Sequence, residues 1–170
     1  DLARQRRVVD AFLAAARDGD FEGLCAWLAP DASFHLDLGQ ATHPAAAVSG
    51  AEAVARQMLQ GAKSFLPYSR PVLVNGAPGR LVGDPRQPRG VAGFTVAGDR
   101  VVRVDVIANP DKLKDIALDE FDGPDEFSGP DADGADPFGD SELREHLRAH
   151  HGLGDPAPEP PVPHTPDHHD

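Results

Sequence analysis

The chain has 170 residues, and its 28 acidic and 16 basic side chains give a formal net charge of −12. The charge is uneven, because residues 1–118 hold 14 basic and 13 acidic side chains whereas residues 119–170 hold 2 basic and 15 acidic ones. So acidic a segment repels nucleic-acid phosphates and is by itself a poor DNA-binding element. One cysteine excludes a disulfide framework and a cysteine-based zinc site, which fits a reducing, cytoplasmic location. No apolar run approaches the roughly 20 residues that a membrane helix needs, so no membrane partner is expected.

Three amphipathic helices are predicted in the first half of the chain. Apolar residues recur at helical spacing across residues 3–18, and the sequence Asp-Gly-Asp at 18–20 ends the pattern. Asp20 is a favourable N-cap for a second helix across residues 21–28. The third helix is expected across residues 50–65, where apolar side chains again fall on one face.

Strands are predicted before and after the third helix. Residues 32–39 alternate apolar and polar side chains, as a half-buried strand does, whereas residues 41–50 are small and are expected to form a loop. Two further pairs of strands follow, with turn signals at residues 75–79 and 97–99. Strands that follow helices, with few crossover helices between them, predict an α+β fold. We expect a cone-shaped, curved, mostly antiparallel sheet covered by the three N-terminal helices.

The pentapeptide NPDKL ends the last predicted strand. Asn109 is a favourable N-cap, and Pro110 is favoured at the first position of a helix. Asp111 suits the helix dipole, and Leu113 begins an apolar spacing typical of a short helix. These residues predict a strand end, a cap and a short docking helix, but they leave Lys112 unexplained.

Two regions are expected along the chain. Residues 1–118 should form the domain, and residues 119–170 should form an acidic tail rich in proline and glycine. The tail is poor in aliphatic side chains and is expected to be mostly disordered, with a short helix near residues 141–151.

The tail also contains two incomplete metal-binding patterns. His146 and His150 have the spacing of the helical half of a zinc finger, but no cysteine pair accompanies them. Asp131, Asp133 and Glu142 mimic three positions of a calcium-binding loop whose glycine and flanking helices are missing. We therefore expect no metal and no cofactor.

Polar residues on the predicted strands are candidates for a pocket. His35 and Asp37 would form a general acid–base pair if they faced a cavity, but the alternation predicts that both point away from the core. Tyr68 and Asp105 are further candidates, although Arg103 is placed to form a surface ion pair with Asp105. No catalytic residue is assigned. Three arginines that lie around a turn are expected to be solvated: Arg80, Arg86 and Arg89.

Two stretches of the sequence resemble a known family. RRVVDAFLAAARDGDFEGLCAWLAPDASF resembles the opening of SnoaL-like domains, which belong to the nuclear-transport-factor-2-like superfamily. VNGAPGRLV…GVAGFTVAGDRVVRVDVIANPDKL resembles the C-terminal domain fused to a subgroup of extracytoplasmic-function sigma factors, whose signature includes NPDKL. The resemblance covers about residues 2–115. The subgroup also carries an Asp-Gly-Gly-Gly-Lys motif after its first strand, of which this sequence retains Asp37 and Gly39.

The resemblance implies a non-catalytic domain that regulates sigma domains upstream in the same chain, with RNA polymerase and promoter DNA as further partners. Asp111 and Lys112 would then face the partner, while Asn109, Pro110 and Leu113 would hold the shape of the loop. Two alternatives remain open at this point. One is a SnoaL-like enzyme of the cyclase or isomerase type, and the other is a sensor whose pocket binds a small apolar ligand.

Overall fold

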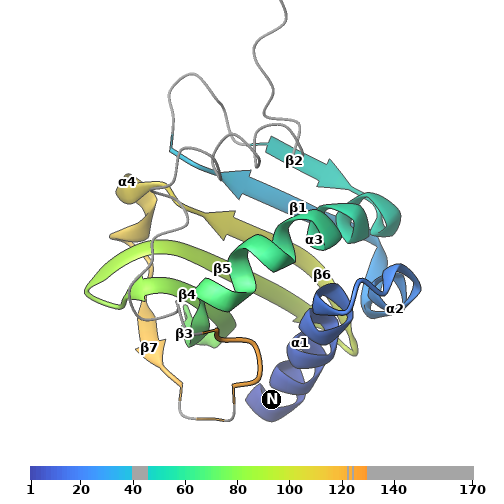
Figure 1. Ribbon diagram of the computed structural model, residues 1–170, viewed down its shortest axis with the longest axis horizontal. Helices are drawn as coiled ribbons and strands as arrows, with labels where there is room; N and C mark the ends of the chain where they lie inside the picture. The colour runs from blue at the N-terminus through green and yellow to red at the C-terminus, as the bar shows by residue number, and fades with distance from the viewer. Residues whose placement is uncertain (40–45, 122, 124, 130–170) are drawn as a thin grey trace, which may run out of the picture.

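The computed structural model describes residues 1–39, 46–121, 123 and 125–129, which form the predicted α+β fold (Figure 1). Helices lie against one curved sheet that does not close on itself. The N-terminal helical elements are α1 (Leu2–Arg17), α2 (Phe21–Trp27), α3 (Ala51–Phe65) and the 3-10 helix η1 (Leu66–Tyr68). No helix in the described part of the chain is long and apolar enough to span a membrane.

Seven strands within the described residues form the sheet, in the order β2-β1-β6-β5-β4-β3-β7. All neighbouring strands are antiparallel except β1 and β6, which are parallel. The strands are β1 (Leu28–Asp37), β2 (Ala46–Ser49), β3 (Arg70–Val74), β4 (Ala77–Asp84), β5 (Gln87–Ala97), β6 (Arg100–Ile107) and β7 (Leu118–Glu120). The parallel pairing brings the C-terminal ends of β1 and β6 side by side.

Strand β2 was not predicted, because residues 41–50 were expected to form a loop. The strand is four residues long and pairs only with β1, Phe34 lying opposite Val48. Its sequence, AAVS, contains one β-branched residue and carries little strand signal of its own. Pairing with the longer β1 therefore determines its conformation.

The turn between β3 and β4 is tighter than the sequence indicated. Asn75 and Gly76 have φ values of 49° and 83°, as a two-residue hairpin turn of the primed type requires. Strand β4 consequently begins at Ala77, so that Pro78 and Gly79 lie in the strand and not in the turn. Asn-Gly alone provides the turn signal.

The main core lies between the helices and the inner face of the sheet. The amphipathic stripe of α1 buries Val8, Val9, Phe12, Leu13 and Ala16, as its periodicity predicted. Side chains of alternate residues on β1, β5 and β6 complete this core. The members on these strands include Phe34, Leu36, Phe94, Val101 and Val104.

A second, smaller cluster lies on the outer face of the sheet. It consists of Val72, Leu81, Val91 and Leu113. The first three come from β3, β4 and β5, and Leu113 comes from the short helix α4 (Pro110–Leu113) that follows β6. The segment after β6 therefore covers part of the face that the N-terminal helices leave open.

Contacts with the domain continue beyond residue 118. Strand β7 pairs with β3, and Phe127 is 7% exposed within the main core. The domain boundary at residue 118 and the disordered tail remain predictions for residues 119–170 as a whole. The short helix expected near residues 141–151 and both metal patterns lie outside the described residues.

Candidate functional site

The pentapeptide NPDKL has the local structure that its sequence predicts. The Asn109 side chain caps α4, its Oδ1 accepting a hydrogen bond from the Asp111 backbone N–H at 3.1 Å. Pro110 occupies the first helical position, and Leu113 is 4% exposed in the outer cluster. The cap and the buried leucine fix α4 at the end of β6.

The Asp37 carboxylate joins this helix to the end of β1. It accepts hydrogen bonds from the Gly39 backbone N–H at 2.9 Å and from Asn109 Nδ2 at 3.4 Å. The Lys112 ammonium lies 2.5 Å from Asp37 Oδ2. Thus the two motifs retained from the family resemblance, about 70 residues apart in the sequence, form one cluster. We call Asp37, Gly39, Asn109 and Lys112 the Asp37 cluster.

The environment of Asp37 lowers its pKa. Burial alone would raise the pKa, but hydrogen bonds from Lys112, Gly39 and Asn109, together with the Lys112 charge, outweigh burial and hold it below the usual range. The carboxylate is therefore ionised at neutral pH and available to hold Lys112.

Gly39 is required by its place in the cluster. Its φ of +73° is a conformation that side chains other than glycine rarely adopt. A Cβ atom on Gly39 would also lie 2.9 Å from the Asn109 Cα, which is too close for a backbone contact. The glycine thus allows the end of β1 to pack against the cap of α4.

Lys112 has a partner within its own domain, because it forms an ion pair with Asp37. The orientation of Asp111 and Lys112 toward a partner stays a prediction. The Lys112 side chain is 58% exposed while that of Asp37 is 16% exposed, so the pair lies at the rim of the cluster. Asp111, Lys114 and Asp115 are exposed on α4 and just after it.

The polar strand residues proposed for a pocket lie elsewhere. His35 and Asp105 are register partners on β1 and β6, in alternation with the inward-facing Phe34 and Val104. Both therefore face away from the helices. Asp105 accepts two hydrogen bonds of 2.9 Å from Arg103, the surface ion pair that the sequence suggested. Tyr68, in η1, is partly buried against the main core and does not line the apolar hollow between α3 and the sheet.

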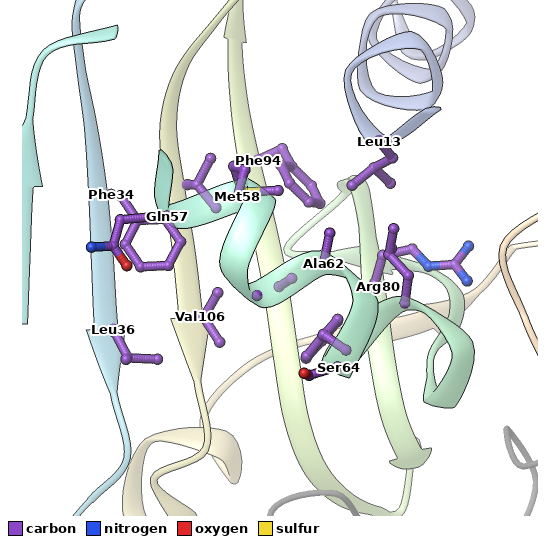
Figure 2. Close-up of a pocket in the computed structure, with 15 residues that line it drawn as sticks. Leu13, Phe34, Leu36, Gln57, Met58, Ala62, Ser64, Arg80, Phe94 and Val106 are labelled. Carbon is purple, nitrogen blue, oxygen red and sulfur yellow. The ribbon is translucent and has the colours of Figure 1, made fainter. Parts of the chain in front are cut away.

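An apolar hollow lies between α3 and the inner face of the sheet (Figure 2). The space within it that the centre of a water molecule can occupy is about 50 Å³. Most of its lining is aliphatic or aromatic, from α1, α3, β1, β5 and β6; the polar residues among the lining are Gln57, Ser64 and Arg80. Figure 2 shows the Arg80 guanidinium at the edge of the group, turned away from Leu36 and Val106. The hollow therefore offers an apolar interior with few polar groups.

Arg80 is buried, which corrects the expectation that it is solvated. It is 2% exposed, and it donates to Ser69 Oγ and the Ser69 carbonyl, each at 2.9 Å. Its Nη1 lies 3.0 Å from Asp125 Oδ1. Burial lowers the Arg80 pKa, although Asp125 opposes that effect. The one sequence signal for this burial is the alternation in strand β4, where Arg80 shares a face with Val82.

The described residues contain no group of three or more His, Cys, Asp or Glu side chains that could hold a metal ion. The Asp37 cluster has one carboxylate, and its other polar groups are an amide, a backbone N–H and an ammonium. Such a set holds a loop in place; it does not provide a cation site.

Comparison with solved structures relates this geometry to known proteins. The extracytoplasmic-function sigma factor SigJ of Mycobacterium tuberculosis is 30% identical and aligns with a TM-score of 0.54. The described residues have a SnoaL-like fold. The alignment covers 65% of this chain and 44% of the SigJ chain, so the chain spans less than half the length of that relative. No family model and no curated protein matches the sequence.

Two further structures are similar to the SnoaL-like domain at lower identity. A nuclear-transport-factor-2-like protein from Burkholderia xenovorans LB400 is 22% identical with a TM-score of 0.45, covering 69% of this chain and 98% of its own. A putative polyketide cyclase from Xanthomonas campestris pv. campestris is 20% identical with a TM-score of 0.41, covering 65% and 94%.

Proposed function

We propose that the SnoaL-like domain is the non-catalytic regulatory domain of an extracytoplasmic-function sigma factor. The similarity to SigJ carries the proposal, because it combines 30% identity with the same fold. The domain would modulate transcription initiation by contacting promoter-binding sigma domains that precede it in the full-length protein. RNA polymerase and promoter DNA would then be indirect partners, and the protein would act in the cytoplasm.

The exposed side of α4 is the contact surface that the geometry supports best. The cap, the buried Leu113 and the ion pair between Asp37 and Lys112 hold this short segment in one conformation. A surface that is already ordered loses less conformational entropy when a partner binds. Asp111, Lys114 and Asp115 are the charged side chains presented there.

The lining of the hollow supports a binding role over an enzymatic one. An amide, a hydroxyl and a guanidinium are the polar groups that reach it among the described residues. None of these groups is a general base near neutral pH. The lining is therefore better suited to binding a small apolar ligand than to catalysing a reaction. Control of the sigma domains by such a ligand is a compatible second proposal. Such a ligand would raise the melting temperature of the full-length protein.

Charge reversal on α4 tests the proposed contact. Asp115→Lys in the full-length protein should change the abundance of the transcripts that the protein controls while leaving its melting temperature unchanged. Asp31→Lys is the matched control, because Asp31 is also exposed but lies on β1, away from α4. Equal transcript levels for wild type and both variants would contradict the proposed contact surface.

A further inference from the structure

Residues 125–129 form a short segment that is bound to the surface of the domain; Figure 1 shows it in orange beside α1. We call these residues the clamp segment. The Gly129 N–H donates to the Pro67 carbonyl at 2.8 Å, and Ser128 Oγ donates to the Ser69 carbonyl at 2.6 Å. Its contacts therefore run along η1 and the residue that follows it.

Two side chains of the clamp segment, those of Asp125 and Phe127, contact arginines. Asp125 pairs with the buried Arg80 guanidinium at 3.0 Å. The Phe127 ring contacts two cations, with the Arg17 guanidinium carbon 5.3 Å and that of Arg80 5.5 Å from the ring centre. A carboxylate and an aromatic ring two residues apart thus match a surface that supplies positive charge and an apolar slot.

Arg80 has its carboxylate partner in the clamp segment. Without that segment, Arg80 would keep its hydrogen bonds to Ser69 but would lose the Asp125 carboxylate and the hydrogen bond to Ser128 Oγ. A buried guanidinium without a counter-charge is unfavourable. The uncovered surface would consequently favour another acidic group in the same place.

The combination of phenylalanine and aspartate found in the clamp segment is repeated in the sequence. The pattern Phe-x-Gly-Pro-Asp occurs at residues 121–125 and again at residues 127–131. Phe121, in the first copy, also lies on an arginine, with the Arg6 guanidinium carbon 4.4 Å from its ring centre. Pairing of arginine with phenylalanine in an acidic context is therefore a repeated feature of this side of the domain.

We propose that the surface formed by Arg17, Ser69 and Arg80 is a binding site for acidic, phenylalanine-containing peptide segments, and that the clamp segment is its exchangeable occupant. This site is separate from α4 and does not depend on the proposed function. Exchange is expected because one buried side chain, one ion pair and a few hydrogen bonds hold five residues, whose conformational entropy opposes binding. Asp125, Glu126 and Ser128 remain at the surface.

Binding of a peptide in trans tests the proposal. The probe is a fluorescent peptide with the sequence of residues 125–129 and one added glycine at each end. It should bind the full chain carrying Asp125→Lys and Phe127→Ala at least tenfold more tightly than it binds wild type, whose own clamp segment competes. If that variant fails to fold, Asp125→Asn with Phe127→Leu takes its place, as the milder pair of changes.

Altered peptides provide the matched controls without changing the protein. Replacing the aspartate by lysine, or the phenylalanine by alanine, should abolish binding. Replacing the glutamate by glutamine should have little effect, because Glu126 is 61% exposed and lies 3.6 Å from Arg17. Equal affinity for wild type and variant, no binding to a folded variant, or tight binding of the lysine or alanine peptide would each overturn the proposal.

Discussion

At the residue scale, Asp37 determines how the end of β1 is joined to α4. One carboxylate receives an ammonium, a side-chain amide and a backbone N–H. Lys112, which local helix signals did not explain, is therefore explained by a contact between distant parts of the chain.

Charge reversal at Lys112 should weaken the domain slightly. Lys112→Glu places a second carboxylate beside Asp37, whereas Lys114→Glu makes the same change at an exposed residue without that neighbour. Because Lys112 is more than half exposed, we expect the loss to be modest, roughly 1 kcal/mol. Chemical denaturation of both variants measures this difference. Equal free energies of unfolding would show that the ion pair contributes nothing to stability.

The pH dependence of stability should report the ionisation of Asp37. Its pKa is lower in the folded than in the unfolded protein, so its contribution is present above the unfolded value and is lost as pH falls through the folded one. The difference in unfolding free energy between wild type and Asp37→Asn should thus be largest at neutral pH. It should shrink below about pH 4, near the usual aspartate pKa. A difference that is constant from pH 7 to pH 3 would contradict this account.

At the scale of elements, the junction between β1 and α4 depends on close backbone packing. Gly39→Ala should destabilise the domain more than Gly98→Ala does. Both glycines have positive φ values, of 73° and 61°, but a Cβ atom on Gly98 would meet nothing within 4 Å. The shared backbone strain costs about 1 kcal/mol, so any excess for Gly39 measures the contact with Asn109. Equal melting temperatures of the Gly39→Ala and Gly98→Ala variants would contradict this contact.

The sequence predicts elements better than it predicts the contacts between them. The stripe of α1, the Asn109 cap and the outward position of His35 all follow from local periodicity or capping. The ion pair between Asp37 and Lys112 requires the parallel pairing of β1 with β6, which local patterns do not specify. The family resemblance identified NPDKL and the remnant of the glycine-rich motif at Asp37 and Gly39, but it did not predict that they contact each other.

Arg80 shows a second limit of sequence reasoning. An arginine in a strand is ordinarily solvated, but Arg80 is buried here and forms an ion pair with Asp125, 45 residues away. Similarly, the four-residue β2 exists because β1 offers it an edge. In each case a long-range partner overrides the local signal.

At the scale of the whole molecule, three surfaces can be distinguished. The inner face of the sheet carries the main core and the apolar hollow, while α4 covers part of the outer face. The clamp segment occupies a third surface beside α1. The surface around α4 shares no residue with the other two, whereas the hollow and the surface under the clamp segment share Arg80.

Photo-crosslinking tests the central claim, contact of α4 with sigma domains, most directly. Lys114 of the full-length protein would be replaced by p-benzoylphenylalanine, and crosslinked peptides would be mapped by mass spectrometry. A probe at Ala97, the exposed last residue of β5 at the end of the β5–β6 hairpin away from α4, is the control. We predict crosslinks from position 114, and not from position 97, to helical sigma domains upstream in the same chain. Crosslinks confined to the SnoaL-like domain, or equal yields from both positions, would contradict the proposed contact.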